Sequence, residues 1–141
     1  MSEEKKNLSA IPAVGTRAAR ERTITDGDIV RFAEVSGDRN PVHLDADYAA
    51  RSPFGQRIAH GFLVGSLISA AIGMDLPGPG SIYLGQTLKF VAPVHIGDTV
   101  TVSVEVIKVR EDKRLITLRT DCTNQNGTLV VTGEAFVKFA G

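Results

Sequence analysis

The chain has 141 residues, and its 16 basic and 16 acidic side chains give a formal net charge of zero at pH 7. A neutral chain has no overall field to attract nucleic acid or an anionic membrane. The single cysteine, Cys122, excludes an internal disulfide and a multi-cysteine metal site. The length fits one domain, and a hydrophobic fraction of 43% is sufficient for a core.

Neither end of the chain shows a targeting signal. The first ten residues are polar with no apolar segment behind them, so we expect a flexible N-terminus over residues 1–10 rather than a secretory signal. The longest apolar stretch, residues 61–76, is interrupted by Gly and Ser and is shorter than a membrane span. These features predict a cytoplasmic protein with one domain over residues 11–141.

The chain is predicted to begin with an edge strand and a helix. Residues 16–24 are polar for a core strand and fit the edge of a sheet. Thr25 and Asp28 have the spacing of a capping box, which predicts a helix start at this point. Gly37 favours a left-handed C-terminal cap and predicts the end of that helix.

Two further helices are predicted after an irregular loop over residues 37–44. Asp45 can cap a short helix over residues 46–51. Residues 61–76 are apolar on nearly every face, as expected of a helix that is buried all round. The sequence PGPG at residues 77–80 ends this helix.

The second half of the chain changes to a period of two, which is typical of β-strands. Four valines from Val100 to Val106 alternate with polar residues, and a slip of this alternation at Ile107 predicts a β-bulge. Further strands are predicted over residues 81–94, around residues 116–122 and over residues 128–139. Short turns separate the later strands, so neighbouring strands pair antiparallel.

This order of elements predicts an α+β domain in which one buried helix lies on an antiparallel sheet. A single sheet covered by one helix leaves its other face and its edges exposed. We therefore expect a homo-oligomer that covers part of this surface.

The loop after the first helix holds the first candidate for chemistry. Asp38 and His43 lie five residues apart, on either side of the turn at Asn40-Pro41. A carboxylate and an imidazole that converge on one point can share a water molecule and move its proton. The alternative is that Asp38 is an ordinary turn residue and His43 a packed or exposed imidazole, which spacing alone favours.

The second candidate is the start of the buried helix at His60-Gly61. The first turn of a helix has free N–H groups, and Gly61 would let a carbonyl oxygen approach them as it becomes an enolate. A glycine needed only for packing is an equal alternative. His60 is more often structural, and Ser66 in mid-helix more often bonds a carbonyl one turn earlier. The histidines lack metal-ligand spacing, so we expect no metal.

The residues of this loop resemble a known signature. FAEVSGDRNPVH, followed by LDADYA, is similar to the hydratase-2 signature of the MaoC-like dehydratase family: an aromatic, Ser-Gly-Asp, Asn-Pro, an aliphatic and His. IAHGFLVGSLIS resembles the family's entry into its central helix. The resemblance covers roughly residues 20–139. It is strongest to the short bacterial (R)-specific enoyl-CoA hydratases.

The resemblance implies a hot dog fold, which is a long helix wrapped by a curved antiparallel sheet, and a homodimer with its site at the subunit interface. It implies that Asp38 and His43 are the catalytic pair and that Asn40 holds the geometry of the loop. It further implies that the Gly61 N–H binds the thioester oxygen and that Ser66 lines the substrate site.

The implied reaction is the reversible addition of water to a short-chain trans-2-enoyl-CoA, which gives (R)-3-hydroxyacyl-CoA, a precursor of polyhydroxyalkanoates. Such a hydro-lyase needs no metal or redox cofactor, and coenzyme A is part of its substrate. One alternative is a 3-hydroxyacyl-acyl carrier protein dehydratase of fatty acid synthesis. Another is a non-catalytic acyl-CoA-binding subunit of the same fold. The partners expected are an acyl-CoA thioester and a second copy of the chain, without nucleic acid or membrane.

Overall fold

The computed structural model describes residues 10–141, so the flexible segment predicted at residues 1–10 falls almost wholly outside the described residues. The helices are α2 (Asp26–Ser36), α3 (Pro41–Leu44), α4 (Ala46–Ala50), α5 (Gly61–Ala70), the π-helical turn η1 (Ala71–Asp75) and the 3-10 turn η2 (Glu111–Lys113). The strands are β1 (Arg17–Thr23), β2 (Ser81–Gln86), β3 (Lys89–Phe90), β4 (Thr99–Arg110), β5 (Leu115–Thr123) and β6 (Leu129–Phe139).

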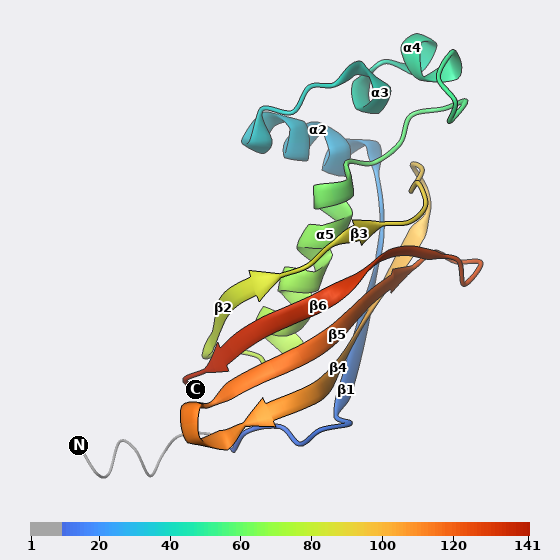
Figure 1. The fold of residues 1–141 in the computed structure, drawn as a ribbon. Coiled ribbons are helices and arrows are strands. Elements are labelled where there is room, and N and C mark those ends of the chain that lie inside the picture. Colours follow the sequence, from blue (N-terminus) through green and yellow to red (C-terminus); the bar gives the residue numbers. More distant parts are fainter. Residues whose placement is uncertain (1–9) are drawn as a thin grey trace.

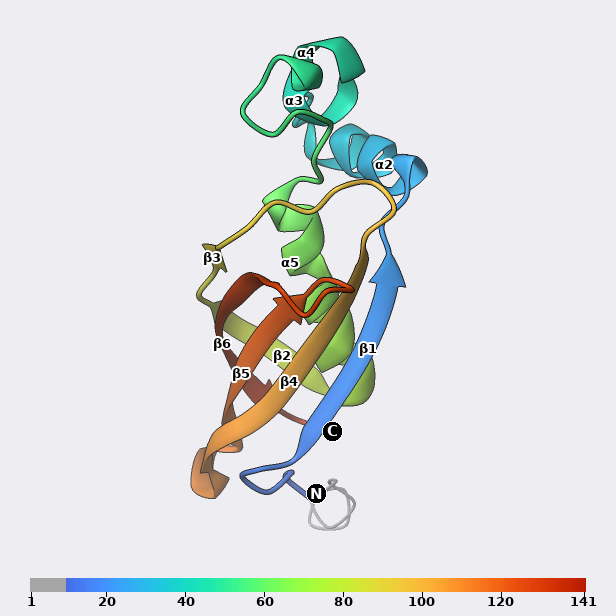
Figure 2. The same cartoon turned by 90° about the vertical axis from the view of Figure 1, so that its right-hand side faces the viewer.

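One antiparallel sheet curves around α5 (Figures 1 and 2). Its strands follow the order β1-β4-β5-β6-β2, and β3 also pairs with β6. The inward side chains of β4, β5 and β6 form the core together with Val64, Ile68 and Ile72 on the helical segment. The predicted α+β architecture is therefore confirmed, and it includes the edge position of β1.

The signals at both ends of α2 act as the sequence predicts. The Thr25 hydroxyl accepts a hydrogen bond from the Asp28 N–H at 3.1 Å, and the Asp28 carboxylate accepts one from the Thr25 N–H at 3.2 Å. At the other end, Gly37 adopts a φ of 79° and donates its N–H to Ala33. The capping box and the glycine therefore fix where the loop that holds Asp38 begins.

The predicted irregular loop over residues 37–44 is wrong in its second half, which forms α3. Asn40 caps this short helix, because its side-chain oxygen accepts from the Val42 N–H at 3.3 Å. Pro41 occupies the first helical position, where its fixed φ suits the helix and its missing N–H costs nothing. The Asn-Pro pair is thus a helix start rather than a plain turn.

The predicted strand over residues 81–94 is shorter and is divided into β2 and β3. The interruption covers Thr87 and Leu88. The side chain of Leu88 turns toward α5, where it lies 3.2 Å from the position of a Cβ on Gly65. After β3 the chain leaves β6, and the Val94 carbonyl accepts from the Ala59 N–H at 2.7 Å. This departure connects the sheet to the segment that leads into α5.

The long helix and the β-bulge are found where the sequence places them. The expectation that the helix is buried all round is wrong, because only one side of it packs on the sheet: Ile68 and Ile72 are buried, whereas Phe62 and Met74 are 65% and 63% exposed. The helix runs from Gly61 to Asp75, but its last turn is π-helical, and the Leu76 N–H reaches back to the Ala71 carbonyl. The register between β4 and β5 shifts at Ile107, between Val106 and Lys108. Among residues 10–141, no helix combines the length and the apolar character that a membrane crossing needs.

Helices α2, α3 and α4 gather beyond the N-terminal end of α5 (Figure 1). Along the length of the sheet, α5 is therefore the helix that covers its inner face. As a result, the loop after α2, the start of α3 and the first turn of α5 meet at one end of the molecule.

Candidate active site

Asp38 is exposed, and most of its hydrogen-bonding capacity is free. Its Oδ1 accepts from the Asn40 N–H at 3.1 Å, an interaction within its own turn. Within the described residues no cation pairs with this carboxylate. Asn40 supports the turn from its position as the cap of α3. The carboxylate therefore keeps lone pairs available to a water molecule.

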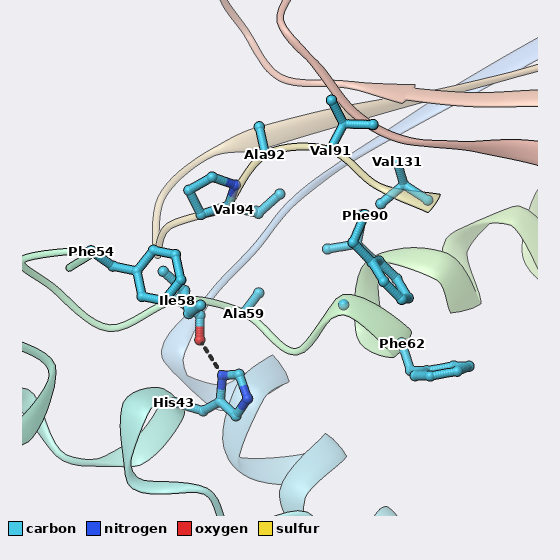
Figure 3. Close-up of a pocket in the computed structure, with 13 residues that line it drawn as sticks. His43, Phe54, Ile58, Ala59, Phe62, Phe90, Val91, Ala92, Val94 and Val131 are labelled. Atoms are coloured by element: carbon cyan, nitrogen blue, oxygen red, sulfur yellow. Dashed lines mark hydrogen bonds between the residues drawn. The ribbon is translucent and has the colours of Figure 1, made fainter. Parts of the chain in front are cut away.

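His43 lies in α3 and is only 8% exposed. Its Nδ1 is 2.8 Å from the carbonyl oxygen of Ile58, the contact drawn in Figure 3. Because a carbonyl oxygen only accepts, Nδ1 carries the proton and Nε2 of the neutral ring carries a lone pair. The tautomer thus leaves Nε2 free to act as a base.

His60 lies directly beside these two residues. It is 2% exposed, and its Nε2–H donates to the Asp38 carbonyl oxygen at 2.9 Å. Its ring stacks on that of His43 with a centroid distance of 3.9 Å. Burial is the main cause that lowers the pKa of His60, so the ring is neutral at pH 7.

The three side chains are close enough to be considered as metal ligands. Asp38, His43 and His60 each offer one ligand atom, and these atoms lie within 4.8 Å of one another. Carboxylate and imidazole donors suit ions such as Zn²⁺. The sequence spacing did not predict this group, because the fold rather than the local sequence brings residues 43 and 60 together.

A pocket of about 350 Å³ opens next to His43. Figure 3 shows His43 at one end of it and apolar side chains around the rest. The walls come from the segment before α5, from the start of α5, from β3 and the segment after it, and from β6: Phe54, Ile58, Ala59, Phe62, Val64, Phe90, Val91, Ala92, Pro93, Val94 and Val131. Such a cavity accepts an apolar chain with a reactive end held at the imidazole.

Gly61 lines this pocket at the N-terminus of α5. In the described part of the chain, no group accepts from the N–H of Gly61 or of Phe62. These donors and the positive end of the helix dipole suit an oxygen that gains negative charge. A Cβ on Gly61 would lie 2.7 Å from the Phe90 ring, so the absence of a side chain also serves packing. Both interpretations of Gly61 therefore have support.

Ser66 faces a different part of the molecule. Its hydroxyl donates to the Leu63 carbonyl at 2.6 Å, the local bond expected of a helix serine. It lines a separate groove between α2 and α5, together with Phe32 and Leu67, and not the pocket at His43. The substrate-binding role of Ser66 stays a prediction.

The structure thus brings Asp38, His43 and Gly61 to one end of α5, with Asn40 in the turn that carries Asp38. Sequence reasoning missed the Ile58 carbonyl that sets the His43 tautomer, because a backbone acceptor has no sequence signal. It also missed the contact of His60 with both other residues. Its position immediately before the predicted helix was the one available sign.

A helix wrapped by a curved antiparallel sheet is the hot dog fold, and solved structures of that class match this chain closely. Residues 9–127 match the family described as the MaoC like domain. The chain belongs to this family.

The similarity to individual relatives extends over most of the chain. The (R)-specific enoyl-CoA hydratase of Aeromonas caviae is 49% identical over 125 residues, which cover 89% of this chain and 93% of that protein. The 3-hydroxybutyryl-CoA dehydratase of Methylorubrum extorquens is 49% identical, covering 89% of this chain and 79% of the relative. A mitochondrial 3-hydroxyacyl-[acyl-carrier-protein] dehydratase of Solanum lycopersicum is 36% identical, and the match covers 86% of this chain and 74% of the relative.

A solved structure agrees with the sequence relatives. The (R)-hydratase from A. caviae involved in PHA biosynthesis superposes with a TM-score of 0.89 at 48% identity and covers 91% of this chain and 97% of its own. The similarity therefore spans the whole domain, including both the loop that holds Asp38 and the start of α5.

Proposed function

We propose that the protein is an (R)-specific enoyl-CoA hydratase, a hydro-lyase that adds water reversibly to short-chain trans-2-enoyl-CoA. The observation that carries this proposal is the arrangement at the end of α5. A His43 ring with its Nε2 lone pair free lines an apolar pocket, and close to this ring lies the Asp38 carboxylate, which no cation pairs among the described residues. The relatives of 49% identity that are named hydratase and dehydratase support the same chemistry.

In the proposed reaction, Asp38 and His43 hold one water molecule against C3 of the substrate. His43 Nε2 takes a proton as the water oxygen bonds to C3. The electrons of the C2–C3 double bond move toward the thioester oxygen, which becomes an enolate. The enolate then collapses, and the proton on His43 passes to C2. One water molecule is added, and both side chains return to their starting states.

The enolate oxygen is placed at the first turn of α5 in this proposal. The N–H groups of Gly61 and Phe62 would donate to it, and losing one such donor typically costs about 3–4 kcal/mol in the transition state. No metal ion or redox cofactor takes part, so dialysis against EDTA should leave the hydration rate unchanged. A rate that falls with EDTA and returns with Zn²⁺ would show that the group at residues 38, 43 and 60 holds a required ion.

We also propose that the acyl chain is short. The helical segment is continuous from Gly61 to Asp75, so packed side chains close the end of the space available to an acyl tail. A CH₂ group that finds apolar surface gains about 0.8 kcal/mol, whereas one that meets packed side chains gains nothing and adds strain. The value of kcat/KM should be greatest from crotonyl-CoA to about hexenoyl-CoA. Equal values for crotonyl-CoA and dodecenoyl-CoA would contradict this.

A homodimer is part of the proposal. Within the described residues β2 pairs only with β6, so its other edge is open, and it exposes Ile82 and Leu84. Phe62 and Phe90, whose ring centroids are 5.6 Å apart, are also largely exposed at the mouth of the pocket. A second copy would cover this edge and these aromatic rings. Light scattering at micromolar concentration should give the mass of a dimer, and a monomer would oppose it.

The direct test is the absorbance of crotonyl-CoA at its enoyl-thioester band. A hydratase removes this band, whereas a non-catalytic acyl-CoA-binding subunit leaves it unchanged. A coupled (R)-specific dehydrogenase then reports whether the product has the R configuration. Crotonyl-acyl carrier protein, assayed at the same concentration, separates the alternative dehydratase function, and a higher kcat/KM for the carrier-bound substrate would favour it.

A further inference from the structure

His60 is in contact with both residues proposed to act on the water molecule. Its Nε2–H donates to the Asp38 carbonyl oxygen at 2.9 Å, and its ring stacks on His43 with an interplanar angle of 28°. The ring also meets that of Phe32 of α2, with centroids 4.8 Å apart and an interplanar angle of 52°. The imidazole therefore lies between α2 and α3, immediately before the first residue of α5.

The hydrogen bond from His60 to Asp38 differs from the others in this loop by the sequence separation of its partners. In the described part of the chain, every other hydrogen bond made by residues 37–40 joins residues no more than four positions apart, such as Asn40 N–H to Asp38 Oδ1. The bond from His60 spans 22 positions. It is therefore the one hydrogen bond that fixes this loop relative to α5.

The segment before α5 thus holds both proposed catalytic residues. The Ile58 carbonyl accepts from His43 Nδ1–H, and two residues later His60 donates to the Asp38 backbone. One short stretch of chain sets the distance between the imidazole and the carboxylate. Errors of about 1 Å in such a distance can reduce a rate by about a hundredfold.

The environment of His60 also keeps it neutral. Burial is the largest cause that lowers the pKa of His60, and His43 lowers it further, whereas the backbone and the carboxylate of Asp38 act in the opposite direction. Its Nδ1 is buried and has no partner among the described residues. A neutral ring stacked on His43 leaves that imidazole free to become the cation during catalysis, which a second cation at this distance would oppose.

We propose that His60 is a positioning residue, which uses its Nε2–H to hold the Asp38 loop and its ring to hold His43, so that both face one water molecule. This inference rests on the proposed hydratase function for its kinetic consequence. Its structural content, which is a hydrogen bond that orders the loop, does not depend on that function.

Two substitutions separate positioning from simple packing. His60→Phe keeps an aromatic ring between Phe32 and His43 and removes an unpartnered buried nitrogen, but it loses the donor. His60→Gln keeps an amide N–H near the position of Nε2 and loses the stacked ring. If His60 only fills space, the Phe variant should be both the more stable and the more active of the two.

Positioning predicts the opposite order for activity. We expect the kcat of His60→Phe on crotonyl-CoA to be at least about tenfold below that of His60→Gln, with KM changed less than about threefold. Thermal unfolding monitored by circular dichroism gives the folded fraction by which each rate is corrected. A Phe variant as active as the Gln variant, or losses that follow the folded fraction, would overturn the proposal.

Hydrogen exchange provides a readout that does not depend on activity. The amide of Asn40, which is bonded to Asp38 Oδ1, should exchange at least about tenfold faster in His60→Phe than in wild type, and much less so in His60→Gln. An inactive wild type would refute the proposed function, yet the exchange rates would still decide whether His60 orders the loop. Unchanged exchange in the Phe variant refutes positioning whatever the wild type does.

Discussion

Two aspartates at the two ends of α2 show how the same side chain is used in opposite ways. Asp28 at the start of the helix is buried and accepts hydrogen bonds from Arg22, Arg31 and the Thr25 N–H. Asp38, just past the helix end, is exposed and accepts from one backbone N–H of its own turn. The first carboxylate has its acceptor sites filled by the protein, and the second keeps them open.

The difference separates a structural carboxylate from a functional one better than sequence position does. The hydrogen bond from Arg22 is the largest cause that lowers the pKa of Asp28 to about 2. A group held in this way stabilises the helix and has little capacity left for a ligand. Asp38 lies instead beside two histidines and has no cation to neutralise it among the described residues.

The largest expected effect is on catalysis at Asp38. Asp38→Asn keeps the shape and removes the charge, and we expect kcat for crotonyl-CoA hydration to fall by at least about a hundredfold. His43→Gln should have an effect of the same size, because it removes the base. The free energy of unfolding should stay within about 0.5 kcal/mol of wild type for Asp38→Asn, and within about 1–2 kcal/mol for the change at the buried His43. Near-wild-type hydration by either one would refute its catalytic assignment.

The matched change at Asp28 should affect stability instead. Asp28→Asn removes charge-assisted hydrogen bonds with two arginines, which predicts a loss of about 2 kcal/mol in the free energy of unfolding. The kcat of the folded variant should stay within about threefold of wild type, because residue 28 does not line the pocket at His43. Denaturant unfolding at one protein concentration measures the first quantity. A stability equal to that of wild type would mean that the exposed arginines contribute nothing.

The acid dependence of stability should show two separate windows. The pKa of His60 is lowered by burial, so the unfolded chain binds a proton that the folded chain resists, and stability falls as pH drops below about 6.5. The pKa of Asp28 is about 2 in the folded protein, so its contribution is complete above 3.8 and is lost as pH falls toward 2.

Variants of His60 and Asp28 show which residue causes the loss of stability in each pH range. His60→Gln should flatten the fall in unfolding free energy that begins as pH drops below about 6.5, and Asp28→Asn should flatten the fall below pH 4. Measured melting curves at each pH test both statements. A fall near pH 6 that is unchanged in His60→Gln would show that another group titrates there.

Local chemistry allowed much of the fold to be predicted from the sequence. The capping box at Thr25, the glycine at position 37 and the slip at Ile107 each act over a few residues, and each was found as predicted. The predictions that were wrong concern segments whose structure depends on contacts with residues far away in the sequence. The strand after Ser81 is interrupted at Thr87 and Leu88, where the Leu88 side chain packs toward α5, a contact that no local pattern identifies.

The candidate site, like the fold, could be predicted from the sequence where local residues determine it. The signature loop supplied Asp38 and His43, which the structure brings to within 4.8 Å of each other, measured between one ligand atom of each side chain. The residues that orient them come from a segment 15 to 22 positions later, through a backbone carbonyl and a buried imidazole. Contacts of this kind depend on how α5 meets α2 and α3, and they leave little trace in composition or periodicity.

The central claim is that Asp38 and His43 act together on one water molecule, and a double variant tests it most directly. The measurement is kcat/KM for crotonyl-CoA in Asp38→Asn, His43→Gln and the two combined. Groups that form one unit are strongly non-additive, so the double variant should be no more than about threefold worse than the poorer single variant. A double variant in which the two losses multiply would show that the residues act independently and would contradict this account.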